Sequence, residues 1–303
     1  MKKMILAVLL INSLVTTAQT TLQEKLGYSK NTRLLIIHGD DLGVAHSQNA
    51  ASIYAMENGS VSSASIMVPC PWFVEIAAWA RTHPKADLGL HLTLTSEWKY
   101  YKWGPVTPKE KVPGLVNTAG FLFESADSVH QSASPAEVET EIRAQIERAR
   151  QFGIDITHLD SHMGTLFFKA EYLQVLVKLG REYKIPVMLP KQLPGVSSVA
   201  TDKDVLVDNV YTASPQDYKN GFNNYYSGIF KSLQPGVSVI LLHAAYDDRE
   251  MQAVSVDHPD WGAAWRQADF NFFTSANCKK LLQENNIRVI TWREIRDKLA
   301  AIP

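Results

Sequence analysis

The sequence is poor in cysteine, since its 303 residues include only Cys70 and Cys278. One pair of thiols cannot define a disulfide-built scaffold, and neither cysteine has the spacing of a thiolate metal site. Cys70 follows an apolar run and Cys278 falls in a helical pattern, so we expect two separate buried thiols. The fold must therefore rest on an ordinary hydrophobic core, for which a chain that is 46% hydrophobic is well supplied.

An excess of one charge sign is also missing. The chain has 30 basic and 31 acidic side chains, a formal net charge of -1, and no long run of either sign. Proteins that bind nucleic acids or membrane surfaces through electrostatics carry a basic excess. We therefore expect no nucleic-acid partner.

A long apolar run is found at the N-terminus, where Lys2 and Lys3 precede the apolar stretch 4–15 and small residues end at Ala18. This is the layout of a secretory signal peptide, with cleavage after Ala18. An uncleaved anchor is the alternative, but the run is shorter than the roughly 20 residues that a spanning helix needs. We expect a signal peptide at 1–18, an extension at 19–32, one domain at 33–303, and an exported, periplasmic or extracellular protein without a stable membrane anchor.

After the leader, apolar β-rich segments alternate with helical patterns, and no linker or repeat divides the series. This alternation is typical of an α/β protein with parallel strands. The pattern predicts strands at 34–37, 65–68, 88–94, 158–162, 187–189, 205–210, 237–244 and 287–291, and helices at 47–58, 72–81, 134–150, 171–183, 216–233 and 265–284. Polar residues gather at the ends of several strands, which favours a single-domain, TIM-like (β/α) barrel, distorted or incomplete, over an open doubly wound sheet.

Two adjacent carboxylates, Asp40 and Asp41, follow the first predicted strand. Neighbouring carboxylates repel each other unless they share a cation or a proton. Gly39 and Gly43 flank the pair and would let the backbone turn, so that both side chains can face one cavity. The alternative is a solvated acidic turn, which is common in loops.

Histidines accompany three later strands. The period of two along a strand puts His158, Asp160 and His162 on one face, and burial of three ionisable groups without an ion or a hydrogen-bond network is costly. His91 stands in a buried-looking strand and alone would be a core residue. His243 ends the strand at 237–242 and is either structural or the proton donor that a hydrolase with a carboxylate base needs.

One Asp and two His would form a three-ligand site with open positions, suited to one divalent metal ion, with Zn²⁺ or Mg²⁺ favoured. Such a site indicates hydrolysis of an amide or an ester. The assigned residues are Asp41, His91 and His162 as metal ligands, Asp40 as the base, His243 as the acid, and His158 and Asp160 as side chains that orient the ligands.

The segments 35–43, 89–93 and 157–162, together with His243, resemble the YdjC-like carbohydrate deacetylases, and their order and spacing agree across residues 33–300. The resemblance implies a distorted (β/α) barrel, the same metal, base and acid residues, and metal-dependent removal of acetyl groups from a small carbohydrate substrate. A metal-dependent esterase or amidase for non-sugar acyl groups, or a secreted carbohydrate-binding protein without catalysis, remains an alternative.

Aromatic residues crowd the start of a long irregular segment at 95–133, and loops of this length are often functional. Aromatic faces can stack on sugar rings near a metal site, or they can seal the loop onto the barrel. The residues concerned are Trp98, Tyr100, Tyr101 and Trp103; Trp261 and Trp265 pose the same question further from the ligands.

Overall fold

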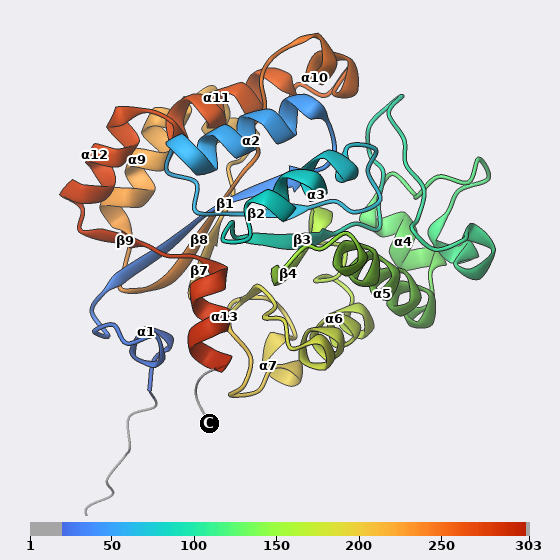
Figure 1. Cartoon of the computed structure of the whole chain (residues 1–303), viewed down its shortest axis with the longest axis horizontal. Coiled ribbons are helices and arrows are strands. Elements are labelled where there is room, and N and C mark those ends of the chain that lie inside the picture. Colours follow the sequence, from blue (N-terminus) through green and yellow to red (C-terminus); the bar gives the residue numbers. More distant parts are fainter. Residues whose placement is uncertain (1–19, 301–303) are drawn as a thin grey trace, which may run out of the picture.

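The computed structural model describes residues 20–300, and the predicted signal peptide at 1–18 lies outside them. A curled parallel sheet runs through the molecule, with helices around its outer face (Figure 1). The strands are β1 (Arg33–Leu42), β2 (Ser63–Ile66), β3 (Leu88–Leu92), β4 (Ile156–Ser161), β5 (Leu189–Pro190), β6 (Leu206–Val207), β7 (Asn209–Tyr211), β8 (Gly236–Leu242) and β9 (Ile287–Val289). The helices are α1 (Leu22–Lys25), α2 (His46–Asn58), α3 (Phe73–Thr82), α4 (Ala126–Ser132), α5 (Pro135–Gln151), α6 (Ala170–Tyr183), α7 (Val196–Val199), α8 (Pro215–Lys219), α9 (Phe222–Ser232), α10 (Arg249–Val254), α11 (Ala263–Phe273), α12 (Ala276–Glu284) and α13 (Trp292–Ala300).

The sheet forms a distorted, incomplete barrel. Its main part has the order β4-β3-β2-β1-β8-β7, and β9 pairs with the start of β1. On the remaining side, a single bridge from Leu159 to Val187 connects β4 to the segment that enters β5, and β5 pairs only with β6. The prediction of a distorted, TIM-like (β/α) barrel is confirmed. Because the strands are parallel, their carboxyl ends meet at one end of the barrel, where such folds place their sites.

Burial explains why these segments form strands. Every residue of β1 from Leu34 to Leu42 is buried, as expected for a strand covered on both faces. Outside the barrel, one apolar cluster joins the sheet to α3, α5 and α6, and a second joins it to α9, α11 and α12. A third cluster fills the interior, where Trp292 and Ile295 of α13 pack against inward residues of β1 and β8.

Several predicted elements are divided in the structure. The predicted helix at 216–233 is α8 and α9, because Gly221 adopts a φ of 89° between them. The predicted helix at 265–284 is α11 and α12, because Ser275 caps a new helix by accepting a hydrogen bond from the backbone N–H of Cys278. The predicted strand at 205–210 is β6 and β7, which pair with different strands. The short helix α10 was not predicted.

The predicted helix after residue 134 is confirmed as α5, with the capping box of Ser134 and Glu137 at its start. The segment at 95–133 is not wholly irregular, since it contains α4 and two short 3-10 turns, Lys109–Lys111 and Pro113–Leu115. Cys70 and Cys278 are free and buried, as expected. Among residues 20–300, no helix combines the length and apolar character needed to cross a membrane.

Candidate metal centre and active site

The acidic pair lies at the carboxyl end of β1 and faces a cavity of about 700 Å³. Adjacent residues of a regular strand point to opposite faces, but Asp41 has a φ of 68°. This left-handed conformation, which Asp tolerates better than most residues, turns the chain so that Asp40 and Asp41 both line the cavity. The predicted turn of the backbone is therefore present. Gly43 adopts a φ of 94° without strain, as a glycine can, whereas the left-handed conformation of Asp41 is a strained one.

Asp41 has one paired and one unpaired carboxylate oxygen. Its Oδ2 accepts a hydrogen bond of 2.8 Å from Nη2 of Arg266. Its buried Oδ1 has no hydrogen-bond partner and lies 3.5 Å from Nε2 of His91 and 3.5 Å from Nδ1 of His162. Burial would raise the pKa of Asp41, but Arg266 and the nearby histidines hold it well below its usual range, so this group is a carboxylate.

Each of these two histidines has a carboxylate on the far side of its ring. Nδ1 of His91 lies 2.6 Å from Oδ1 of Asp160, and Nε2 of His162 lies 3.0 Å from Oε2 of Glu97. An N–H donated to each carboxylate leaves the opposite ring nitrogen, the one facing Asp41, with a free lone pair. Burial lowers the pKa of His162, but the carboxylates of Glu97 and Asp41 outweigh burial and raise it to about 10, so without an ion the nitrogen facing Asp41 also holds a proton, which a bound ion would displace. The pocket is thus built to hold positive charge.

The donor set fits a divalent cation. One carboxylate oxygen and two imidazole nitrogens, all from buried residues, lie within 4.8 Å of one another. The two 3.5 Å separations match the spacing of ligands around an ion with bonds of about 2.0–2.2 Å. An ion here would also satisfy the unpaired oxygen of Asp41, whose burial without a partner is otherwise costly. The structure therefore brings together the three predicted ligands in a geometry that suits a metal.

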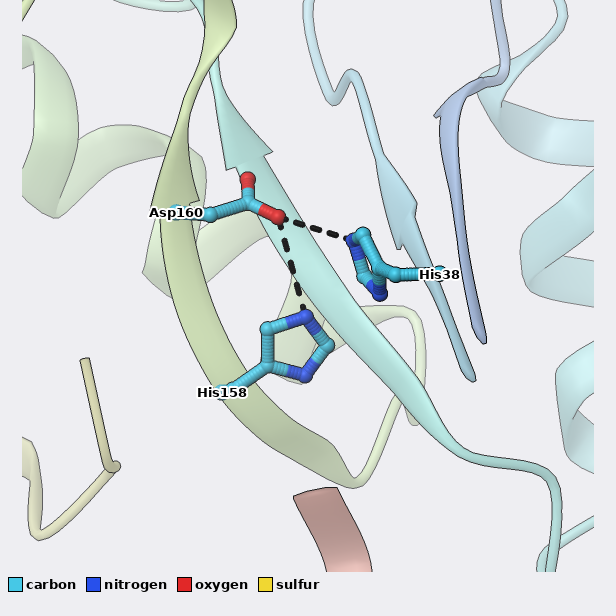
Figure 2. A group of neighbouring side chains, drawn as sticks. All are labelled: His38, His158 and Asp160. Carbon is cyan, nitrogen blue, oxygen red and sulfur yellow. Dashed lines mark hydrogen bonds and ion pairs between the residues drawn. The ribbon is translucent and has the colours of Figure 1, made fainter. Parts of the chain in front are cut away.

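A second buried cluster lies beneath this centre, made of His38, His158 and Asp160 (Figure 2). Oδ2 of Asp160 lies 3.0 Å from Nε2 of His38 and 3.7 Å from Nε2 of His158. Burial lowers the pKa of His38, but Asp160 and Asp40 outweigh it and raise the pKa to about 10; burial lowers the pKa of His158. The two carboxylates thus favour the charged form of His38, whereas burial favours the neutral form of His158, which stacks on Trp292.

The predicted base and acid both line the cavity. Oδ1 of Asp40 lies 3.0 Å from Nε2 of His38 and accepts a hydrogen bond of 3.2 Å from the Ser65 hydroxyl. Nε2 of His243 lies 3.9 Å from Oδ2 of Asp41, and the backbone N–H of His243 donates to Asp269. Burial lowers the pKa of His243 to about 4, so its ring is neutral at pH 7.

The four aromatic residues of the loop have different environments. Trp98 lines the cavity and lies against the guanidinium of Arg266, 5.3 Å from the ring centre. Trp103 is buried and donates its indole N–H to the carbonyl of Thr95, and Tyr101 donates its hydroxyl to the carbonyl of Val44. Tyr100 is 74% exposed and does not line the cavity. Of the two alternatives for these residues, sealing the loop fits Tyr101 and Trp103, while Tyr100 faces solvent and Trp98 is the one of the four that lines the cavity, so stacking on a sugar stays a prediction for Trp98.

Three residues of the site were not predicted. Glu97 and Arg266 contact the predicted ligands directly, and His38 contacts the predicted base. The sequence pattern could have predicted His38 as a site residue, because the strand period of two places it on the same face as Asp40. No sequence pattern predicts Arg266 as a site residue, since it lies in an ordinary helical pattern far along the chain.

Fold and site together define a distorted parallel barrel with a candidate divalent metal centre at the carboxyl ends of its strands. The model of the YdjC-like protein family matches residues 34–284, and the chain belongs to this family. A carbohydrate deacetylase from Thermus thermophilus is 30% identical over 290 residues, which cover 92% of this chain and 99% of the relative. A chitooligosaccharide deacetylase from Klebsiella pneumoniae is 23% identical, covering 87% and 99%.

The fold also recurs in a solved structure. A crystal structure from Enterococcus faecalis, described as a cellobiose-phosphate cleavage protein, aligns with a TM-score of 0.74. The two chains are 24% identical, and the alignment covers 87% of this chain and 99% of the other. This likeness shows that the fold of this chain is one observed in a crystal structure.

Proposed function

We propose that the protein is a metal-dependent carbohydrate deacetylase, which hydrolyses the amide bond of N-acetylated sugars. The observation that carries the proposal is the buried, unpartnered Oδ1 of Asp41 facing one nitrogen of His91 and one of His162, directly beside a second carboxylate, Asp40. Membership of the YdjC-like family and relatives named as deacetylases support the choice of reaction and substrate class.

In this proposal Asp41, His91 and His162 hold the ion, with Zn²⁺ or Mg²⁺ favoured. When bound, a divalent ion would polarise the amide carbonyl and help to activate water. Arg266 fixes the orientation of Asp41 through its 2.8 Å hydrogen bond. Asp160 and Glu97 fix the rings of the two histidines.

Asp40 takes the proton from the attacking water. His38 and Ser65 hold its Oδ1, which leaves Oδ2 to accept that proton. His243 is the proton donor to the leaving amine. Because its ring is neutral in the free protein, His243 must take up a proton before it donates one, and the proton that Asp40 removes from the attacking water balances this step.

Acetate release from N-acetylated oligosaccharides, measured with the purified chain and several divalent ions, tests the proposal. Asp40→Asn should bind the ion and the substrate but release little acetate. Turnover of ester or amide substrates without a sugar, in the absence of acetate release from sugars, would favour an esterase or amidase instead. Sugar binding without any turnover in the parent chain would point to a binding protein.

We also propose that the protein is exported. The support is the sequence of residues 1–18, with two lysines, an apolar stretch and a small residue before the expected cleavage site. Fractionation of the native host followed by N-terminal sequencing should find a chain that begins at Gln19 outside the cytoplasm. A cytoplasmic chain that retains Met1 would contradict export without affecting the proposed chemistry.

A further inference from the structure

The residues that line the cavity of the candidate metal centre include a polar group and an apolar group, which we call its polar wall and its apolar wall. One wall is polar and includes Glu97, His258, Asp260 and Arg266. The other is apolar and is supplied by separate segments of the chain. Its members include Phe167, Phe168, Met188, Leu193, Val210 and Leu241.

The apolar wall begins directly beside the reacting groups. Leu241 of β8 is the register partner of His38, and it precedes His243 by two residues. The backbone N–H of Met188 bonds to the carbonyl of Leu159, so Met188 follows the bridge that places this segment beside β4. Met188 belongs to the apolar cluster of the barrel interior and Leu241 packs against it, so this cluster anchors the start of the wall.

The apolar wall includes side chains of very different exposure. Leu193 is nearly buried, at 9% exposure, in the turn after β5. Phe168 is 67% exposed, so an apolar ring faces water at the entrance. An apolar ligand that covers this ring together with the buried members of the wall would remove its surface from water, which is favourable.

This wall is larger than an acetyl group requires. A methyl group contacts only the few side chains whose atoms come within about 4.0–4.5 Å of it. Four members of the wall, Met188, Leu193, Val210 and Leu241, are aliphatic: they carry neither an N–H or O–H group nor an aromatic face on which a sugar ring could stack. Sugar hydroxyls placed against them would therefore lose their hydrogen bonds to water without replacement. A hydrocarbon chain has no such cost.

We propose that the apolar wall binds the acyl chain of N-acylated sugars whose acyl group is longer than acetyl, while the sugar lies toward the polar wall. The inference rests on the proposed deacylation. The reaction is balanced by water: its oxygen bonds to the acyl carbon, the C–N bond breaks, and the nitrogen gains a proton. The products are a free carboxylate and an amino sugar.

The expected effect follows from burial of methylene groups. Each buried CH₂ contributes about 0.8 kcal/mol, which corresponds to about a four-fold change in an equilibrium or rate ratio. We expect kcat/KM to rise by up to about four-fold per added methylene, until the chain outgrows the wall.

The test compares glucosamine carrying N-acetyl, N-propanoyl, N-butanoyl and N-hexanoyl groups, with release of the free amine measured on the purified chain and a divalent ion. Leu193→Phe should shorten the wall and lower the ratio of hexanoyl to acetyl turnover. Val74→Phe is the matched control, because Val74 is 58% exposed on α3 and does not line the cavity.

The outcomes separate this inference from the proposed function. The inference is supported if kcat/KM rises with acyl-chain length and if Leu193→Phe suppresses this rise while Val74→Phe does not. Turnover of the acetyl substrate together with a kcat/KM that falls with every added methylene would overturn the inference and leave the deacetylase proposal standing. A rise that Leu193→Phe leaves unchanged would overturn the assignment to this wall. Release of no acyl group from any sugar would overturn both proposals.

Discussion

Glu97 should control metal affinity although it does not contact the predicted ion. Its carboxylate lies 3.0 Å from Nε2 of His162 and fixes which ring nitrogen faces Asp41. A hydrogen bond to a charged group contributes roughly 1.5–3 kcal/mol, and about 1.4 kcal/mol corresponds to a factor of ten. Glu97→Ala should therefore weaken metal binding by about 10- to 100-fold, in line with the usual effect of carboxylates behind ligand histidines.

A graded pair of variants separates charge from geometry. Glu97→Gln removes the charge but keeps an oxygen that can accept a hydrogen bond from the His162 N–H. Its loss of metal affinity should therefore be about ten-fold, at the lower end of the range expected for Glu97→Ala. The dissociation constant of the ion is measured by calorimetry or by competition with a chelator. Glu124→Gln is the control, because Glu124 lies on the same loop, pairs with Lys102 and is largely exposed. Parent-like affinity in Glu97→Ala would refute this account of His162.

Three further perturbations follow from the geometry. Asp40→Asn should lower turnover by about 100-fold or more while metal affinity stays within a few-fold of the parent, and full acetate release by this variant would remove Asp40 from the base role. Gly89→Ala should destabilise the protein by about 1–3 kcal/mol in urea unfolding, because a Cβ there would overlap the buried His158 ring; unchanged stability would mean that this ring moves freely. A divalent ion at about 100 times its dissociation constant should stabilise the fold by about 2.7 kcal/mol and raise the thermal midpoint, and Asp41→Ala, which lacks the central ligand, should show no such rise.

The fold could be predicted from the sequence wherever the residues of a segment alone determine its secondary structure. Alternation of apolar strands with helices predicted the parallel barrel, and the capping box at Ser134 predicted α5. The errors lie where a local break interrupts a continuing pattern. Gly221 and Ser275 each begin a second helix directly after the C-cap of the first, Asn220 and Thr274, yet the apolar periodicity on both sides continues and conceals the break.

The same distinction applies to the site. Asp41 follows a predicted strand, His162 ends one and His91 lies within one. Parallel strands bring their carboxyl ends together, so the convergence of these residues could be expected. Glu97 and Arg266 come from a loop and a helix, whose positions over the barrel depend on tertiary packing. The sequence contains no periodicity that brings Arg266 of α11 to within 2.8 Å of Asp41.

The left-handed backbone of Asp41 depends both on the strand that carries the predicted ligands and on Arg266 of the distant helix α11. A regular strand would send Asp40 and Asp41 to opposite faces, and only the turn at φ 68° brings both carboxylates to one cavity. Such a conformation has a cost of order 1–3 kcal/mol, so surrounding contacts must hold it. Arg266 holds the turned carboxylate by its Oδ2, and Gln48, which also bonds Arg266, donates to the backbone carbonyl of Asp40. The acidic pair can therefore serve one centre because a helix distant in sequence fixes the turn, which is why the sequence predicted its residues but not its geometry.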